Sequence, residues 1–327
     1  MVAGYGTGRY TRSLFREITF DGSNARVPMT ALLPNRTYEI HEVAELTGLA
    51  TARLRAWERR YEVVRPARQP NRYRTYTSEQ VALLRAFARL CAAGERIGDL
   101  VRESRESVIA RAEGRATDGS PLSRMLEAVK RLDRVRLVAL LEEQRRGMDS
   151  DRFGREIILP LGEIIGDLWA LGRLSVAAEH FASEVVVQQL KLELSATGGN
   201  SPVLLAACLP GERHEWGFLV TLVRLQTSGW RVQYLGTDLP LKDIVDAAWT
   251  LVPQVVALSA ADPANVSSRL PELRRLRRLL PPGTLVVLGG QGSEINGSRL
   301  RRAGLKVGAE VIAQPKVTPV RSGARNP

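Results

Sequence analysis

The sequence predicts a multidomain protein of the α and α/β classes: a winged helix-turn-helix, then a four-helix bundle, then a Rossmann-like parallel sheet. Three observations predict it. Arginine-rich helix, turn and ribbon patterns follow one another between residues 38 and 76; helical periodicity runs from 121 to about 196; and short apolar strands alternate with helices from 201 to 314. The 327 residues suffice for two or three domains with buried cores.

Composition excludes several classes of protein. The hydrophobic fraction of 44% is too high for wholesale disorder, and no apolar run is long enough to cross a membrane. The N-terminus lacks a signal-peptide pattern. Cys91 and Cys208 lie far apart in apolar segments, which predicts buried thiols of a cytoplasmic protein and no disulfide or metal framework. The net charge of +12 suits a polyanionic partner.

Changes in pattern along the chain predict the domain boundaries. The linker is predicted from its Gly, Ala, Thr, Asp and Ser content. The expected units are a flexible arm (1–36), the winged helix-turn-helix domain (37–113), a linker (114–120), the bundle (121–199), the α/β domain (200–314) and a tail (315–327).

The first domain has the pattern of a DNA-binding unit. An apolar helix face ends at Gly48, a second helix covers about residues 50–60, and the alternation over 72–76 suits a β-ribbon wing. Further helix follows from 81 to 107, with a break near Gly94. Between Thr51 and Tyr76 there are eight arginines against two glutamates, a cluster that codon bias does not explain. We therefore expect contacts to phosphates and guanines from Thr51, Arg53, Arg55, Arg72, Arg74 and Tyr76; the alternative is a solvated charged face.

The bundle is predicted from four amphipathic segments, 121–129, 132–146, 150–171 and 174–196. Four side chains near the turn between the last two helices are candidates for a ligand site: Trp169, Val176, Glu179 and His180. The alternative for each is structural, because bundles usually bury their tryptophan and a Glu-His pair is often a solvated ion pair.

The α/β domain is predicted from strands at 202–209, 231–236, 254–259 and 284–289, with helices at 215–228, 240–251, 267–280 and 294–304. His214 follows the first strand, between a Pro210-Gly211 turn and Gly217. The carboxyl ends of parallel strands are where open α/β sheets bind ligands. The arginine-rich helix 267–280 is expected to be a solvated face, with a subunit or DNA contact as the alternative.

The first domain resembles the MerR family of winged helix-turn-helix regulators. The resemblance lies in Tyr38-Glu39-Ile40, Thr47-Gly48, Leu54-Arg55-Ala56-Trp57-Glu58-Arg59-Arg60-Tyr61 and Arg74-Thr75-Tyr76. The Arg-Ala-Trp-Glu-Arg-Arg-Tyr version is similar to the branch that carries a cobalamin-binding C-terminus. No cysteines with metal-ligand spacing lie nearby, which argues against a metal sensor.

The rest of the chain resembles the CarH/LitR type of that branch. Nine residues separate Trp169 from Glu179-His180, and Val176 falls where the family places an apolar contact to the 5′-deoxyadenosyl group. Glu212-x-His214-x-x-Gly217 resembles the cobalamin-binding motif of methionine synthase and mutases, which continues here at Ser259 and at Gly289-Gly290. The motif's leucine is replaced by Ala261.

The resemblance implies how the chain would hold its cofactor. His214 would be the lower cobalt ligand, with Glu212 fixing its tautomer. Gly217 would let a helix begin close to the corrin. Ser259, Gly289 and Gly290 would leave a slot for the dimethylbenzimidazole tail, and the bundle would cap the upper face.

The resemblance also implies a function, that of a transcriptional repressor and not an enzyme. The expected protein binds adenosylcobalamin, is a tetramer on double-stranded operator DNA in the dark, and is released when light breaks the Co–C bond. One departure is Ala170, because the best-known type has a histidine there that coordinates cobalt after illumination. Either His180 or water would take its place.

Three other functions stay open at this point. One is a cobalamin-binding regulator that does not respond to light, and another is a regulator that senses methylcobalamin or another tetrapyrrole. The third is a corrinoid methyltransferase module, against which the DNA-binding residues 38–76 argue.

Overall fold

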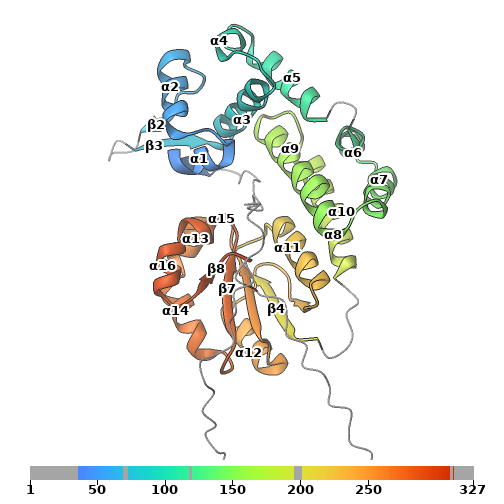
Figure 1. The fold of residues 1–327 in the computed structure, drawn as a ribbon, viewed down its shortest axis with the longest axis vertical. Helices are drawn as coiled ribbons and strands as arrows, with labels where there is room; N and C mark the ends of the chain where they lie inside the picture. The colour runs from blue at the N-terminus through green and yellow to red at the C-terminus, as the bar shows by residue number, and fades with distance from the viewer. Residues whose placement is uncertain (1–35, 69–72, 118–119, 195–200, 310–311, 313–327) are drawn as a thin grey trace, which may run out of the picture.

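The computed structural model describes residues 36–68, 73–117, 120–194, 201–309 and 312. The predicted arm, except Arg36, and the predicted tail lie outside these residues. The N-terminal domain and the bundle lie at one end of the long axis and the sheet domain at the other (Figure 1). The winged helix-turn-helix, the bundle and the parallel sheet are all present, so the predicted fold class is confirmed.

The helix-turn-helix consists of α1 (Ile40–Thr47) and α2 (Thr51–Tyr61). Gly48 ends α1 at φ 69°, a left-handed conformation that glycine adopts without a Cβ penalty. A small antiparallel sheet in the order β1-β3-β2 packs beside the two helices. Its strands are β1 (Thr37–Glu39), β2 (Ala67–Arg68) and β3 (Arg74–Thr77), of which only β3 overlaps the predicted wing stretch 72–76.

Three helices complete this domain: α3 (Ser78–Ala92), α4 (Ile97–Leu100) and α5 (Arg105–Thr117). A capping box begins α3, since Thr77 Oγ1 accepts from the Gln80 amide (3.2 Å) and Gln80 Oε1 accepts from the Thr77 amide (3.1 Å). The chain breaks after α3 as predicted, at Gly94. However, α5 continues through Gly114 to Thr117, into the expected linker, because one glycine costs a helix only about 1 kcal/mol.

The bundle contains the four expected helices, the third of which is composite. Ser175 begins the last helix by accepting a hydrogen bond from the Ala178 amide (3.1 Å). The elements are α6 (Pro121–Lys130), α7 (Arg134–Arg146), the continuous run of α8 (Ser150–Phe153), the π-helical turn η1 (Gly154–Ile158) and α9 (Leu159–Ala170), and then α10 (Val176–Glu193).

The α/β domain is a five-stranded parallel sheet in the order β5-β4-β6-β7-β8. Its central strands β4 and β6 are buried at every residue, as expected for strands covered on both faces. The short β8 was not predicted. The strands are β4 (Val203–Cys208), β5 (Arg231–Tyr234), β6 (Val255–Ser259), β7 (Leu285–Gly289) and β8 (Lys306–Val307).

Among the described residues, six helices cover the sheet. The predicted helix 267–280 is divided at Arg269, because Pro271 suits the first turn of a new helix. The predicted helix 294–304 is likewise two short helices. The helices are α11 (Trp216–Thr227), α12 (Leu241–Leu251), α13 (Pro263–Ser268), α14 (Leu270–Leu279), α15 (Gln291–Ile295) and α16 (Gly297–Arg302).

One hydrophobic core runs from the bundle into a face of the sheet, and α11 lies at the junction. Two glycines permit this close packing. A Cβ at Gly154 would lie 2.5 Å from Val220 Cγ1, and one at Gly162 would lie 2.9 Å from Trp216 Cε3. The bundle is therefore in direct contact with the helix that follows the His214 loop. Among the described residues, no helix is long and apolar enough to cross a membrane.

Candidate cofactor site and nucleic-acid interface

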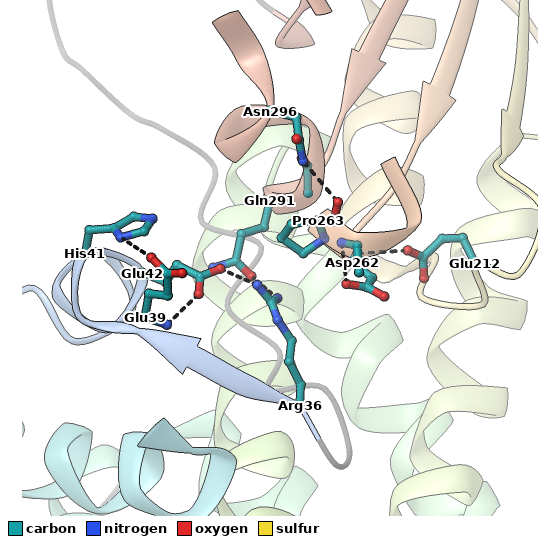
Figure 2. Close-up of polar contacts among 11 residues, drawn as sticks. Arg36, Glu39, His41, Glu42, Glu212, Asp262, Pro263, Gln291 and Asn296 are labelled. Atoms are coloured by element: carbon teal, nitrogen blue, oxygen red, sulfur yellow. Dashed lines mark hydrogen bonds and ion pairs between the residues drawn. The ribbon is translucent and has the colours of Figure 1, made fainter. Parts of the chain in front are cut away.

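The loop between β4 and α11 places Glu212 and His214 together at the carboxyl edge of the sheet. Glu212 is 2% exposed, and its Oε1 lies 2.7 Å from His214 Nδ1 and accepts from the His214 amide at 2.8 Å. Its Oε2 accepts from the amides of Ala261 (2.5 Å) and Asp262 (3.3 Å) in the loop after β6. One buried carboxylate therefore ties two sheet-edge loops together and orients the imidazole (Figure 2 shows its bond to Asp262).

The charge on Glu212 selects the histidine tautomer. Burial alone would raise the pKa of Glu212, but hydrogen bonds from the His214 ring and amide and from Ala261 outweigh burial and hold the pKa below its ordinary value. An ionised carboxylate only accepts, so His214 Nδ1 carries the proton that it donates. In the neutral ring Nε2 is then the nitrogen with the lone pair, and the half-exposed ring leaves it accessible. A neutral imidazole held in this way is suited to bind a metal centre.

The ends of β6 and β7 place Ser259 and Gly289-Gly290 at the same edge of the sheet as this pair. Ser259, 1% exposed, has a hydroxyl without a hydrogen-bond partner among the described residues, although buried polar groups are nearly always paired. Gly290 has φ 91°, and a Cβ there would lie 2.4 Å from the Ala260 carbonyl oxygen. A Cβ at Gly289 would meet only one atom within 4 Å, the Leu258 carbonyl oxygen at 4.0 Å. An unpartnered hydroxyl beside side-chain-free backbone fits the tail of a bound corrinoid.

Gly217, the last residue of the motif, is buried in the first turn of α11. No group of three His, Cys, Asp or Glu side chains within the described part of the chain could hold a free metal ion.

The four bundle candidates lie where α9 turns into α10. Trp169 packs partly buried against the core, Val176 is 55% exposed, and Glu179 Oε2 lies 2.6 Å from His180 Nδ1. His180 is 74% exposed. No hydrogen bond or ion pair in the described residues joins any of the four to the His214 loop. The structure thus brings together the sheet-edge residues as one group and the bundle residues as another.

The bundle end with Trp169 is joined to the DNA-binding domain by a buried charge cluster that the sequence did not reveal. Asp167 Oδ1 lies 2.7 Å from Arg85 Nη1 and Oδ2 lies 2.7 Å from Arg89 Nη2, so α9 is held to α3. Arg85 Nε also donates to the Leu46 carbonyl (2.9 Å) near the end of α1. A single carboxylate, two residues before Trp169, therefore connects the bundle to the helix-turn-helix.

A second contact joins the DNA-binding domain to the sheet edge. Arg36 lies 4.6 Å from the centre of the Tyr38 ring, pairs with the buried Glu42 and donates to Gln291 Oε1 (3.2 Å) (Figure 2). Gln291 directly follows Gly289-Gly290. Arg36, directly before β1, therefore contacts the edge of the sheet that carries the candidate site.

The predicted DNA-contact residues have different environments. Arg53 and Arg55 are exposed on α2, and Thr51 is partly exposed at its start. Arg72 lies outside the described residues. Arg74 is 30% exposed and its Nε lies 2.7 Å from Glu58 Oε2, so its charge is neutralised within the domain.

The prediction of a DNA contact for Tyr76 is wrong. Its side chain is 0% exposed and its hydroxyl donates to Glu58, because β3 packs against α2. Burial first, and then this bond to Glu58, raise its pKa. Sequence reasoning also left out Arg59 and Arg60, which are exposed in the last turn of α2 and belong to the same arginine cluster.

The predicted burial of the cysteines holds for Cys208, whereas Cys91 is only partly buried. Both are free thiols.

Comparison with protein families agrees with this arrangement. Residues 38–103 match the MerR HTH family regulatory proteins, and residues 202–318 and 122–191 match two B12-binding domain families.

Two repressors of Myxococcus xanthus are similar over most of their length. The "HTH-type transcriptional repressor CarH" is 35% identical over 269 residues, which cover 79% of this chain and 90% of that protein. The "HTH-type transcriptional repressor CarA" is 34% identical over 264 residues, which cover 79% of this chain and 88% of that protein. Among solved structures, the monomethylamine corrinoid protein of Methanosarcina barkeri aligns with 15% identity and a TM-score of 0.43, over 56% of this chain and 89% of its own.

Proposed function

The chain belongs to the family of MerR-type transcriptional repressors with a cobalamin-binding domain, and from this premise we propose that it is a light-released repressor that depends on adenosylcobalamin. In the dark the cofactor-bound chain would be a homo-oligomer, a tetramer, on double-stranded operator DNA. The observation that carries the proposal is the Glu212–His214 pair. Its free Nε2 lies at the carboxyl edge of the sheet, in a chain that also carries an arginine-rich helix-turn-helix.

The residues of the lower face would act as a preformed holder. His214 would bind cobalt through Nε2 while Glu212, held by the Ala261 and Asp262 amides, keeps Nδ1 protonated. The Ser259 hydroxyl would donate to the cofactor's tail, and Gly290 would leave the backbone open beside it. When bound, adenosylcobalamin would supply a cobalt–carbon bond that visible light breaks.

The residues of the bundle would sense the upper ligand. Trp169 and Val176 offer apolar surface, and Glu179 with His180 offers polar groups at the same end of the bundle. A shift of this end would reach the helix-turn-helix through Asp167, Arg85 and the Leu46 carbonyl. The chain thus contains a physical connection between the sensing end and the DNA-binding domain.

A second candidate function is a cobalamin-binding repressor that does not respond to light. Ala170 favours it, because this residue offers no side-chain ligand and packs partly buried against the core of the DNA-binding domain. His180, highly exposed and paired with Glu179, is the nearest histidine in sequence. In this case illumination would change the absorbance of the cofactor and leave DNA binding unchanged.

The test begins with binding of adenosyl-, methyl- and hydroxocobalamin to the full chain in the dark, followed by absorbance. We expect tight binding of adenosylcobalamin to the unmodified chain and weaker binding to His214→Ala. We also expect His214→Ala to change the electron paramagnetic resonance spectrum of the reduced cobalamin, because this spectrum reports nitrogen coordination to cobalt. Phe218→Leu, a conservative change of a buried residue in the same helix region, serves as the folding control. If no cobalamin binds, or if His214→Ala has the affinity and spectrum of the unmodified chain, the proposed ligand is wrong.

A further inference from the structure

The outer surface of the sheet domain carries a dense basic face on α14 and α16. Between Arg269 and Lys306 the chain has eight arginines and one lysine against two glutamates. Arg274, Arg277 and Arg278 lie at positions i, i+3 and i+4 and so share one side of α14. All are exposed, as are Arg301 and Arg302 on α16. Arg277 Nη1 lies 3.5 Å from the Gly304 carbonyl, which places the two sets side by side.

In the part of the chain that the structure describes, no carboxylate pairs with these cations. Within the described residues no ion pair involves any basic side chain between 269 and 306. The bundle, by contrast, pairs Arg152 with Glu156 (3.0 Å) and Arg155 with Asp151 (2.9 Å) one helical turn apart. Like charges that gather without partners repel one another and slightly destabilise the fold. We infer that an anionic molecule neutralises these charges when it binds.

The helices that carry the basic face lie on the same side of the molecule as α2, the second helix of the helix-turn-helix. In Figure 1, α14 and α16 are at the left of the sheet domain, and α2 with the wing strands β2 and β3 is at the left of the upper domain. The bundle helices α6 and α7 are on the opposite side. A polyanion held against α2 that runs along the long axis would meet α14 and α16.

The chemistry of the face fits phosphate. Arginine forms forked hydrogen bonds to phosphate oxygens and remains charged. The large apolar side chains that a membrane-binding surface requires are nearly absent from the exposed positions of α14 and α16. The exception, Leu279, lies at the α12 side, where its carbonyl accepts from Trp249 Nε1 (2.8 Å). We propose that the α14–α16 face is a second DNA-binding surface, which contacts the phosphate backbone of duplex DNA flanking the operator without reading its sequence.

The test measures binding of the full chain to a duplex of mixed sequence as a function of salt. Each phosphate contact contributes about −0.9 to the slope of log K against log salt concentration. In the test variant, glutamine, which favours helix, replaces Arg274, Arg278 and Arg302 together. We expect this variant to reduce the magnitude of the slope by between about 1 and 3 and to bind all duplexes more weakly by the same factor. Arg53→Gln with Arg55→Gln instead removes preference for the operator over the mixed duplex.

A control variant with the same change in net charge distinguishes the loss of a specific contact surface from the loss of net positive charge. Arg131, Arg136 and Arg146, all exposed on the bundle, are replaced by glutamine, and this variant is expected to retain nearly the whole slope. The proposal is overturned if the α14–α16 variant retains the slope, or if the control loses as much. It is also overturned if the α14–α16 variant instead changes the mass of the oligomer or binding to anionic vesicles. If the unmodified chain binds no DNA, the regulator function itself fails.

Discussion

Replacement of Asp167 by asparagine tests the buried charge cluster that joins α9 to the DNA-binding domain. The side chains of Asp167 and Arg85 are 4% and 5% exposed, so asparagine would remove the negative charge that lies 2.7 Å from the buried Arg85 guanidinium. Removing one partner of a buried pair typically costs about 3–5 kcal/mol. Because the asparagine carbonyl still accepts one hydrogen bond, we expect a loss near about 3 kcal/mol in the free energy of unfolding.

Arg89→Gln is the matched comparison, since it removes the other partner of the same carboxylate. Arg89 is 30% exposed, so water replaces much of its interaction. We expect a loss of about 1 kcal/mol or less. Urea unfolding followed by circular dichroism gives the free energies, and hydrogen exchange resolved by peptide shows whether protection is lost in α3 and α9.

A double variant distinguishes the charge from the packing. Arg85→Met with Asp167→Leu removes both charges and keeps apolar volume, and we expect it to recover most of the stability that Asp167→Asn loses. If Asp167→Asn lowers the free energy of unfolding no more than Arg89→Gln, or if its lost protection lies away from α3 and α9, the buried pair does not hold α9 to α3 in the way proposed.

Three further predictions concern the sheet domain. Gly290→Ala should destabilise the fold by at least about 1–3 kcal/mol, because the added Cβ collides with the Ala260 carbonyl at a residue that already has a positive φ. Gly283→Ala is the control, since Gly283 also has a positive φ (87°) but has open space around it, so alanine there carries only the conformational cost. Equal melting temperatures of the two variants would contradict this prediction. Glu212→Gln should weaken cobalamin affinity about 10–100-fold, because it weakens the hydrogen bond that holds the His214 imidazole in its orientation. An unchanged dissociation constant in an absorbance titration would show that the carboxylate is dispensable. Burial raises the pKa of Cys208 to about 12, so its thiol should stay protonated and resist alkylation at pH 9 until the protein unfolds; rapid native labelling would contradict its burial.

Local patterns in the sequence were enough to predict most of the fold. The four bundle helices and four of the five parallel strands follow from periodicity, because each has a long apolar face or run. The two-residue strand β8 has too few residues to carry a pattern. The helix was predicted to end at 107 and the linker to begin at 114, whereas α5 ends at Thr117, because a single glycine costs a helix only about 1 kcal/mol.

The site could be predicted only where its residues are close in sequence or follow a strand. Glu212 and His214 are two residues apart, so their pairing could be expected, whereas the Arg85–Asp167 pair spans two domains and leaves no local pattern. For Tyr76 a local pattern was present but led to the wrong expectation of a DNA contact. The basic, aromatic alternation of the wing suggested exposure, but Glu58 on α2 draws the hydroxyl into the core.

Light control of DNA binding can be tested with one sample measured twice: the full chain with adenosylcobalamin on operator DNA, in the dark and after green light. Size-exclusion chromatography with light scattering would give the mass of the protein, and fluorescence anisotropy of the DNA would give its binding. We expect a dark oligomer bound to DNA that falls apart and releases the DNA on illumination. An assembly that keeps its mass and its DNA while the cofactor spectrum changes would contradict light control and favour the light-independent repressor.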